Sequence, residues 1–121
     1  EFRSKVFEFK IKIREFLNNI HSEKKMVLGY GASTKGNVLL HFCNITSRDI
    51  PYIAEVNTDK FGCYTPGTLI PIISEKEARN MNPDYFFVLP WHFKDFILEK
   101  ELSRTEGKVS LLFPLPSIKV F

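Results

Sequence analysis

A glycine-rich stretch, residues 26–40, constrains the fold of this chain more than any other segment. Its first three residues are apolar and run into a glycine, a pattern that predicts a short buried strand. Val38, Leu39 and Phe42 then recur at helical spacing and predict the apolar face of a helix. We expect this helix to begin near Lys35. A buried strand followed at once by a helix is the opening unit of an alternating α/β domain.

The turn between this strand and this helix is rich in residues that leave backbone N–H groups free. Gly29, Gly31 and Gly36 lie in or beside it. Ser33 and Thr34 are available as helix caps. Bare N–H donors and the positive end of a helix dipole suit an anion, most often a phosphate. The turn therefore predicts a phosphate-binding position.

Two standard phosphate motifs match this turn only in part. The dinucleotide fingerprint requires a glycine where Thr34 stands. The phosphate loop of nucleotide hydrolases requires Lys-Ser or Lys-Thr after its last glycine, whereas Asn37 follows here. Lys35 favours a ligand over an empty turn, because a cation inside a glycine turn packs poorly and binds phosphate well.

Residues 2–20 carry two competing patterns. Apolar and charged residues alternate from Phe7 to Ile13, which is the period of a strand. Seven apolar residues also share one arc of a helix: Phe2, Val6, Phe9, Ile13, Phe16, Leu17 and Ile20. The helix accounts for more positions, and no turn residue interrupts the segment. We therefore predict an N-terminal helix over residues 1–22 that packs on the rest of the domain.

This helix leaves Phe7 and Ile11 one turn apart on its opposite face. Exposed apolar pairs are typical of contact surfaces, so we expect both to be partly exposed in the isolated domain. The chain also begins with Glu1-Phe2-Arg3 and lacks an initial methionine, so we expect it to be a fragment of a longer protein. We expect Phe7 and Ile11 to contact the preceding domain of that protein.

The rest of the chain alternates strands and helices. Strands are expected over 50–56, 69–73, 85–89 and 109–113, and helices over 74–80 and 91–102. The segment Ser74-Glu75-Lys76-Glu77 is a capping box that opens the first of these helices. Pro114 and Pro116 follow the last strand, and we expect the tail to cross the surface without extending the sheet. This order predicts one domain, 1–121, with an open, mostly parallel sheet of about five strands and helices on both faces.

In a parallel sheet every strand ends at the same edge, and ligands bind in the crevice outside that edge. Glu55 ends the second strand, where nucleotide folds bind a ribose hydroxyl, and Lys60 lies in a long loop that can act as a flap. An aromatic side chain such as Trp91 can stack on a base or a sugar. The predicted substrate-binding residues are Tyr30, Gly31, Ala32, Ser33, Thr34, Lys35, Gly36, Asn37, Glu55, Asn57, Lys60, Pro90, Trp91 and His92.

Composition excludes several other classes of function. The formal charge is only +3, from 17 basic and 14 acidic residues, which gives no case for a nucleic-acid-binding protein. No apolar run approaches the ~20 residues of a membrane span. Cys43 and Cys63 have neither metal spacing nor a cysteine-rich context, so we expect no zinc site, no disulfide and a cytoplasmic protein. Cys43 is expected to be buried on the apolar side of its helix. No set of catalytic residues stands out.

With these residues in hand, the chain resembles the C-terminal domain of the S-adenosylmethionine-dependent sugar C-methyltransferases. The matching segments are Gly29-Tyr30-Gly31-Ala32, Lys35-Gly36-Asn37, Asn57 with Lys60 and Gly62, Pro66-Gly67-Thr68, Ile70-Pro71-Ile72, Pro83-Asp84-Tyr85, Leu89-Pro90-Trp91 and Phe113-Pro114-Leu115-Pro116. The family often has Asp where Glu55 stands and Pro where Thr58 stands. The resemblance covers nearly the whole chain from about Val6.

The resemblance implies a Rossmann-like domain that helps to hold a nucleotide-linked keto-deoxysugar. It also implies that a preceding domain binds S-adenosylmethionine, so we expect no cofactor on this domain. The implied reaction is deprotonation next to a keto group, followed by attack of the enolate on the donated methyl group. Two alternatives remain open from the residues. One is a free-standing Rossmann-type regulatory module that binds a nucleotide or coenzyme A. The other is an interaction domain whose glycine turn holds no ligand.

Overall fold

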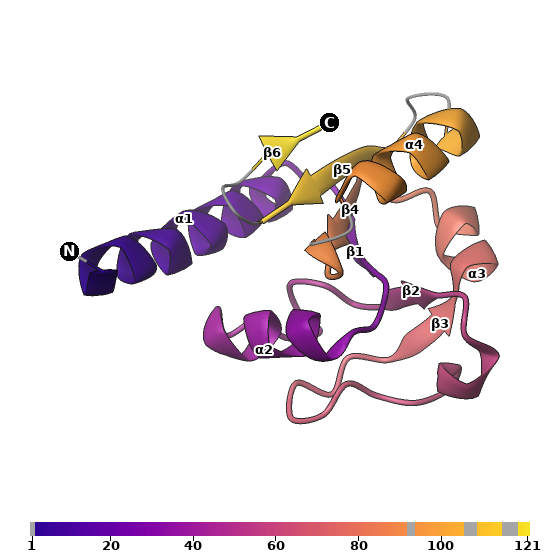
Figure 1. Cartoon of the computed structure of the whole chain (residues 1–121), viewed down its shortest axis with the longest axis horizontal. Coiled ribbons are helices and arrows are strands. Elements are labelled where there is room, and N and C mark those ends of the chain that lie inside the picture. Colours follow the sequence, from indigo (N-terminus) through magenta and orange to yellow (C-terminus); the bar gives the residue numbers. More distant parts are fainter. Residues whose placement is uncertain (1, 92–93, 106–108, 115–118) are drawn as a thin grey trace.

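Six strands form one open sheet in a computed structural model, which describes residues 2–91, 94–105, 109–114 and 119–121 (Figure 1). The strands are β1 (Val27–Tyr30), β2 (Ile53–Glu55), β3 (Ile72–Ser74), β4 (Tyr85–Val88), β5 (Ser110–Phe113) and β6 (Lys119–Val120). Their order across the sheet is β3-β2-β1-β4-β5-β6. The first five are parallel to one another, and β6 pairs antiparallel with β5. The chain order reverses direction at β1 and β4, which places the crevice of an α/β sheet between their ends.

Helices cover both faces of the sheet. They are α1 (Phe2–Ser22), α2 (Thr34–Phe42), α3 (Glu75–Asn80) and α4 (Lys94–Thr105), with a short 3-10 turn η1 (Thr58–Lys60). α1 and α2 pack on one face and α3 and α4 on the other (Figure 1). Alternate residues of each strand feed the two cores: in β4, Phe87 faces α1 and α2, whereas Phe86 and Val88 face α3 and α4. The predicted α/β architecture is confirmed.

The predicted N-terminal helix is also confirmed. Ile13, Leu17 and Ile20 are buried against the sheet, while Phe7 and Ile11 are 66% and 46% exposed. The expected exposure of this pair is therefore borne out, and the competing strand interpretation is wrong. Phe2 and Val6, which were assigned to the buried arc, have side chains outside the part of the chain that the structure describes.

The buried face of α2 differs from the one predicted. The helix packs on the sheet through Leu39, Leu40 and Cys43, while Val38 and Phe42 are 64% and 40% exposed. Both faces fit the helical period. The face that packs on the sheet is rotated by about 100°, or one residue, from the predicted face. The expected burial of Cys43 is confirmed, and both cysteines are free.

The C-terminal tail does extend the sheet, contrary to the prediction. β6 pairs antiparallel with β5, and Phe121 exchanges two backbone hydrogen bonds of 2.9 and 3.0 Å with Leu111. The Phe121 ring also packs edge-on against Phe113, with centroids 5.7 Å apart. Prolines remove N–H donors only at their own positions, so the residues after them can still pair. Pro116 itself lies outside the described residues.

None of the described helices is long and apolar enough to cross a membrane.

Candidate functional site

The glycine turn begins where β1 ends. Gly31 has φ of +79°, a conformation that favours glycine, and it turns the chain out of the sheet. Ser33 then caps α2: its hydroxyl oxygen accepts from the backbone N–H of Gly36 at 3.1 Å. The predicted capping role of Ser33 is thereby confirmed.

Glu55 at the end of β2 ties this turn in place. One carboxylate oxygen accepts from the backbone N–H of Ala32 at 2.9 Å. The other accepts from Val56 and Asn57 at 2.8 and 2.9 Å. Lys60 completes the arrangement: its Nζ donates to the Ala32 carbonyl at 2.8 Å and lies 3.9 Å from Glu55. A carboxylate offers about four acceptor positions, so one remains for a ligand hydroxyl.

The N-terminus of α2 presents donors to the space in front of the sheet. No described residue accepts a hydrogen bond from the backbone N–H groups of Thr34 or Lys35, which are among the donors that every helix start leaves unpaired. The Lys35 side chain is exposed beside them. This combination of N–H groups, helix dipole and ammonium suits an anion with several oxygens.

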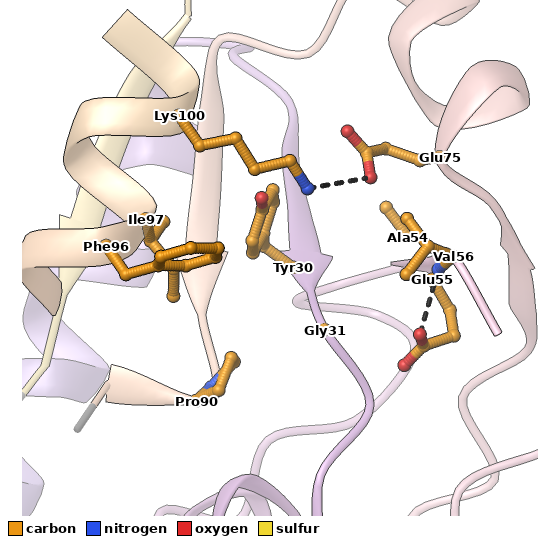
Figure 2. A pocket seen from close by; sticks show the side chains of 10 residues that line it. All are labelled: Tyr30, Gly31, Ala54, Glu55, Val56, Glu75, Pro90, Phe96, Ile97 and Lys100. Atoms are coloured by element: carbon orange, nitrogen blue, oxygen red, sulfur yellow. Dashed lines mark hydrogen bonds and ion pairs between the residues drawn. The ribbon is translucent and has the colours of Figure 1, made fainter. Parts of the chain in front are cut away.

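A cavity of about 470 Å³ lies on the α3 and α4 side of the turn (Figure 2). Its walls are mostly apolar and come from the ends of three strands and from α4: Tyr30, Gly31, Val56, Pro90, Phe96 and Ile97. Figure 2 shows the Phe96 and Tyr30 rings next to each other, with Pro90 below them and Val56 across the space. Phe96 is 69% exposed at the opening. We call this space the apolar cavity.

A network of charged groups lies beside the apolar cavity, and its members Glu75 and Lys100 line the cavity. Glu101 is completely buried and accepts from the Tyr30 hydroxyl at 2.8 Å. Arg79 bonds both Glu101 and Glu75, and Lys100 Nζ lies 3.9 Å from the Glu75 carboxylate (Figure 2). Burial, reinforced by the hydrogen bond to Glu101, raises the pKa of the Tyr30 phenol, which therefore stays protonated as a donor.

Sequence reasoning missed this network except for Tyr30. The sequence does contain a pattern that could have revealed Glu101. It lies four residues after Ile97 and therefore on the same buried face of α4. A carboxylate on an apolar helix face requires a buried partner. The partner, Arg79, comes from α3, which no local pattern connects with α4.

A second hollow of about 320 Å³ lies on the other side of the glycine turn, between α2 and the loop that follows η1. Its lining is more polar and includes Ser33, Asn37, Lys60, Tyr64 and Thr65. The Oδ1 atom of Asn37 is buried and has no hydrogen-bond partner among the described residues. Buried acceptors are nearly always paired, so this atom is a natural contact for a ligand hydroxyl or a water. We call this space the polar hollow.

The predicted site residues thus gather at one edge of the sheet, divided by the turn. Tyr30, Gly31, Glu55 and Pro90 line the apolar cavity, and Ala32, Ser33, Asn37 and Lys60 line the polar hollow. Lys35 and Asn57 are exposed. Trp91 is partly buried and packs against both cores, and Gly36 is buried against Leu89. His92 lies outside the described residues, as does the side chain of Thr34.

Among the described residues, no group of three or more His, Cys, Asp and Glu side chains is placed to hold a metal ion. The candidate site consists of a helix start, whose first N–H donors are free among the described residues, and a cavity on each side. Such an arrangement is suited to holding an elongated ligand with a charged centre.

The chain matches a known protein family and a curated relative. The family model described as the C-methyltransferase C-terminal domain matches residues 1–116. The C-methyltransferase NovU of Streptomyces niveus is 32% identical over 120 residues, which cover 99% of this chain and 29% of that relative. The chain therefore spans less than a third of the length of this curated relative.

Proposed function

The chain belongs to the family of C-methyltransferase C-terminal domains, and we propose that it binds the nucleotide-linked keto-deoxysugar that such an enzyme methylates. The sugar is the methyl acceptor, and the nucleoside diphosphate is the handle by which this domain holds it. Contacts with the nucleoside diphosphate, which does not react, supply binding energy that positions the reacting carbon of the sugar.

The start of α2 carries this proposal. The backbone N–H groups of Thr34 and Lys35 lie in the first turn of α2, and the Lys35 side chain is exposed at the same helix start. A diphosphate fits this position, because it offers several anionic oxygens to several donors at once. Lys60 is held close by through the Ala32 carbonyl and adds a second cation to the field around the turn.

The two cavities accommodate the two ends of such a ligand. The nucleobase fits the apolar cavity, where Phe96 and Tyr30 supply aromatic surfaces and Lys100 and Glu75 supply a donor and an acceptor. The sugar fits the polar hollow, where the unpaired Oδ1 of Asn37 can accept from a hydroxyl. A ligand that spans both would cross the glycine turn, where Gly31 lines one cavity and Ala32 the other, and its diphosphate would then lie near the start of α2.

S-adenosylmethionine is the methyl donor under this proposal, bound by the preceding part of the enzyme. A base removes a proton next to the keto group, and the enolate carbon then takes the methyl group from the donor sulfur. The residues of this chain bind and orient the acceptor. We place no catalytic residue among them.

Titration calorimetry of the 121-residue chain tests the proposal. The probes are UDP-, dTDP-, GDP- and ADP-glucose, with NAD and coenzyme A for the regulatory alternative. We expect at least one nucleoside diphosphate sugar to bind with an affinity that falls as salt is raised. Tighter binding of NAD or coenzyme A than of every sugar nucleotide would favour the regulatory module.

The Lys35→Ala variant tests the position of the diphosphate. A charge-assisted contact contributes roughly 1.5–3 kcal/mol, so the affinity should fall about tenfold to a hundredfold. Lys76→Ala is the matched control, because Lys76 is also exposed and also the second residue of its helix. If the two variants bind the nucleotide sugar with equal affinity, the proposed position of the diphosphate at the start of α2 is wrong.

A further inference from the structure

The outward face of α1 carries a groove that the proposed substrate site does not use. It has a volume of about 260 Å³, and its lining combines apolar and charged residues: Phe7, Lys10, Ile11, Arg14, Glu15, Cys43 and Asn44. We call it the α1 groove. Phe7 and Ile11 are 66% and 46% exposed, and Phe42, which lies under the Lys10 ammonium at 5.9 Å, is 40% exposed. Large apolar groups gathered on a surface are typical of a contact site.

The floor of the α1 groove is rigid. Arg14 donates to Asp49 at 2.6 Å and to the carbonyl oxygens of Cys43 and Asn44 at 3.0 and 2.7 Å. These bonds fasten the middle of α1 to the end of α2. Burial raises the pKa of the Cys43 thiol to about 11, so at neutral pH it adds a neutral, weakly polar surface. A groove that is formed in advance binds its partner at a lower entropic cost.

We propose that the α1 groove is the docking site for the part of a C-methyltransferase that precedes residue 1. Two observations identify this occupant. The chain matches a C-terminal domain and covers only 29% of NovU, so most of such an enzyme lies before this domain. α1 is the first element, and its N-terminal half extends past the sheet (Figure 1), so chain that enters it arrives beside Phe7.

The chemistry of the α1 groove defines what it accepts. Phe7 and Ile11 lie one helical turn apart and leave room for an apolar side chain between them. Arg14 is neutralised by Asp49, whereas the Lys10 ammonium lies over the Phe42 ring. The docking segment therefore carries an apolar residue, with an acidic one that faces Lys10 and lies away from Glu15. This inference rests on family membership and does not depend on which ligand the substrate site holds.

Hydroxyl-radical footprinting by mass spectrometry tests the proposal without any mutation. It compares the 121-residue chain with the full-length polypeptide that carries these residues at its C-terminal end. We expect the oxidation rate of Phe7 to fall at least threefold in the full-length protein, while that of Phe121, which is 46% exposed at the opposite end of the chain, stays unchanged. An unchanged rate at Phe7, or a reading frame that begins at residue 1, would overturn the proposal.

The double variant Phe7→Lys with Ile11→Lys separates docking from folding. We expect the melting temperature of the 121-residue chain to be unchanged and that of the full-length protein to fall by several degrees. Asn18→Lys with Asn19→Lys is the control, because it adds the same two charges at exposed positions of the same helix. If the first variant unfolds the 121-residue chain, the pair belongs to its own core. If Phe7 is protected in that chain in a concentration-dependent way, a second copy is the occupant. Either result contradicts the proposal.

Discussion

The carboxylate of Glu55 connects two parts of the site through three backbone N–H groups. Ala32 belongs to the glycine turn, and Val56 and Asn57 begin the loop after β2. Hydrogen bonds to a charged acceptor are stronger than those between neutral groups, and Glu55 is only 9% exposed. The predicted ribose contact stays a prediction, while the structural role of this residue is visible directly.

Glu55→Gln tests that structural role. The amide keeps one acceptor oxygen but turns an NH₂ group toward backbone donors, which leaves at least one of them unpaired. We expect the free energy of unfolding, measured by urea denaturation, to fall by about 1–3 kcal/mol. Glu8→Gln is the control, because Glu8 is exposed on α1. Equal stability of the two variants would show that Glu55 does not hold the turn.

At the scale of elements, α2 approaches β4 closely because Gly36 has no side chain. A Cβ atom built on Gly36 would lie 2.4 Å from the Leu89 Cβ and 3.2 Å from its Cα. This close approach brings the start of α2, with Ser33 as its cap, over the end of the sheet. Close packing against Leu89 therefore requires a glycine at position 36, whether or not a phosphate binds.

We expect Gly36→Ala to destabilise the protein even though alanine favours helices. The gain in helix propensity is about 1 kcal/mol, whereas overpacking of this kind costs about 1–3 kcal/mol. The backbone of β4 cannot move without disturbing the parallel ladder with β1. Thermal unfolding followed by circular dichroism should show a lower melting temperature for Gly36→Ala than for Lys35→Ala in the same helix. A higher melting temperature would mean that α2 can shift freely.

At the scale of the whole molecule, the proposed division of labour predicts binding without turnover. The 121-residue chain should bind a nucleotide sugar, yet transfer no methyl group from S-adenosylmethionine to a keto-deoxysugar nucleotide. The measurement is the incorporation of a radiolabelled methyl group, with the full-length enzyme as the positive control. Turnover by the 121-residue chain would place the donor site and the catalytic base within it.

Sequence alone predicts the element order, the parallel sheet, the N-terminal helix and the edge at which the unusual residues gather. These features depend on local periodicity, on turn residues and on the rule that parallel strands end at one edge. The capping of α2 by Ser33 and of α3 by Ser74 is local in the same sense, since each cap contacts a residue three positions later.

Contacts between side chains of different elements depend on the tertiary structure. It divided the candidate residues between the apolar cavity and the polar hollow, because the glycine turn passes between the two faces of the sheet. It joined Tyr30, Arg79 and Glu101, which come from β1, α3 and α4. It also rotated α2 away from the predicted face and added β6 to the sheet. The free energies of packing and pairing depend on partners that are distant in sequence, so periodicity within one segment does not contain them.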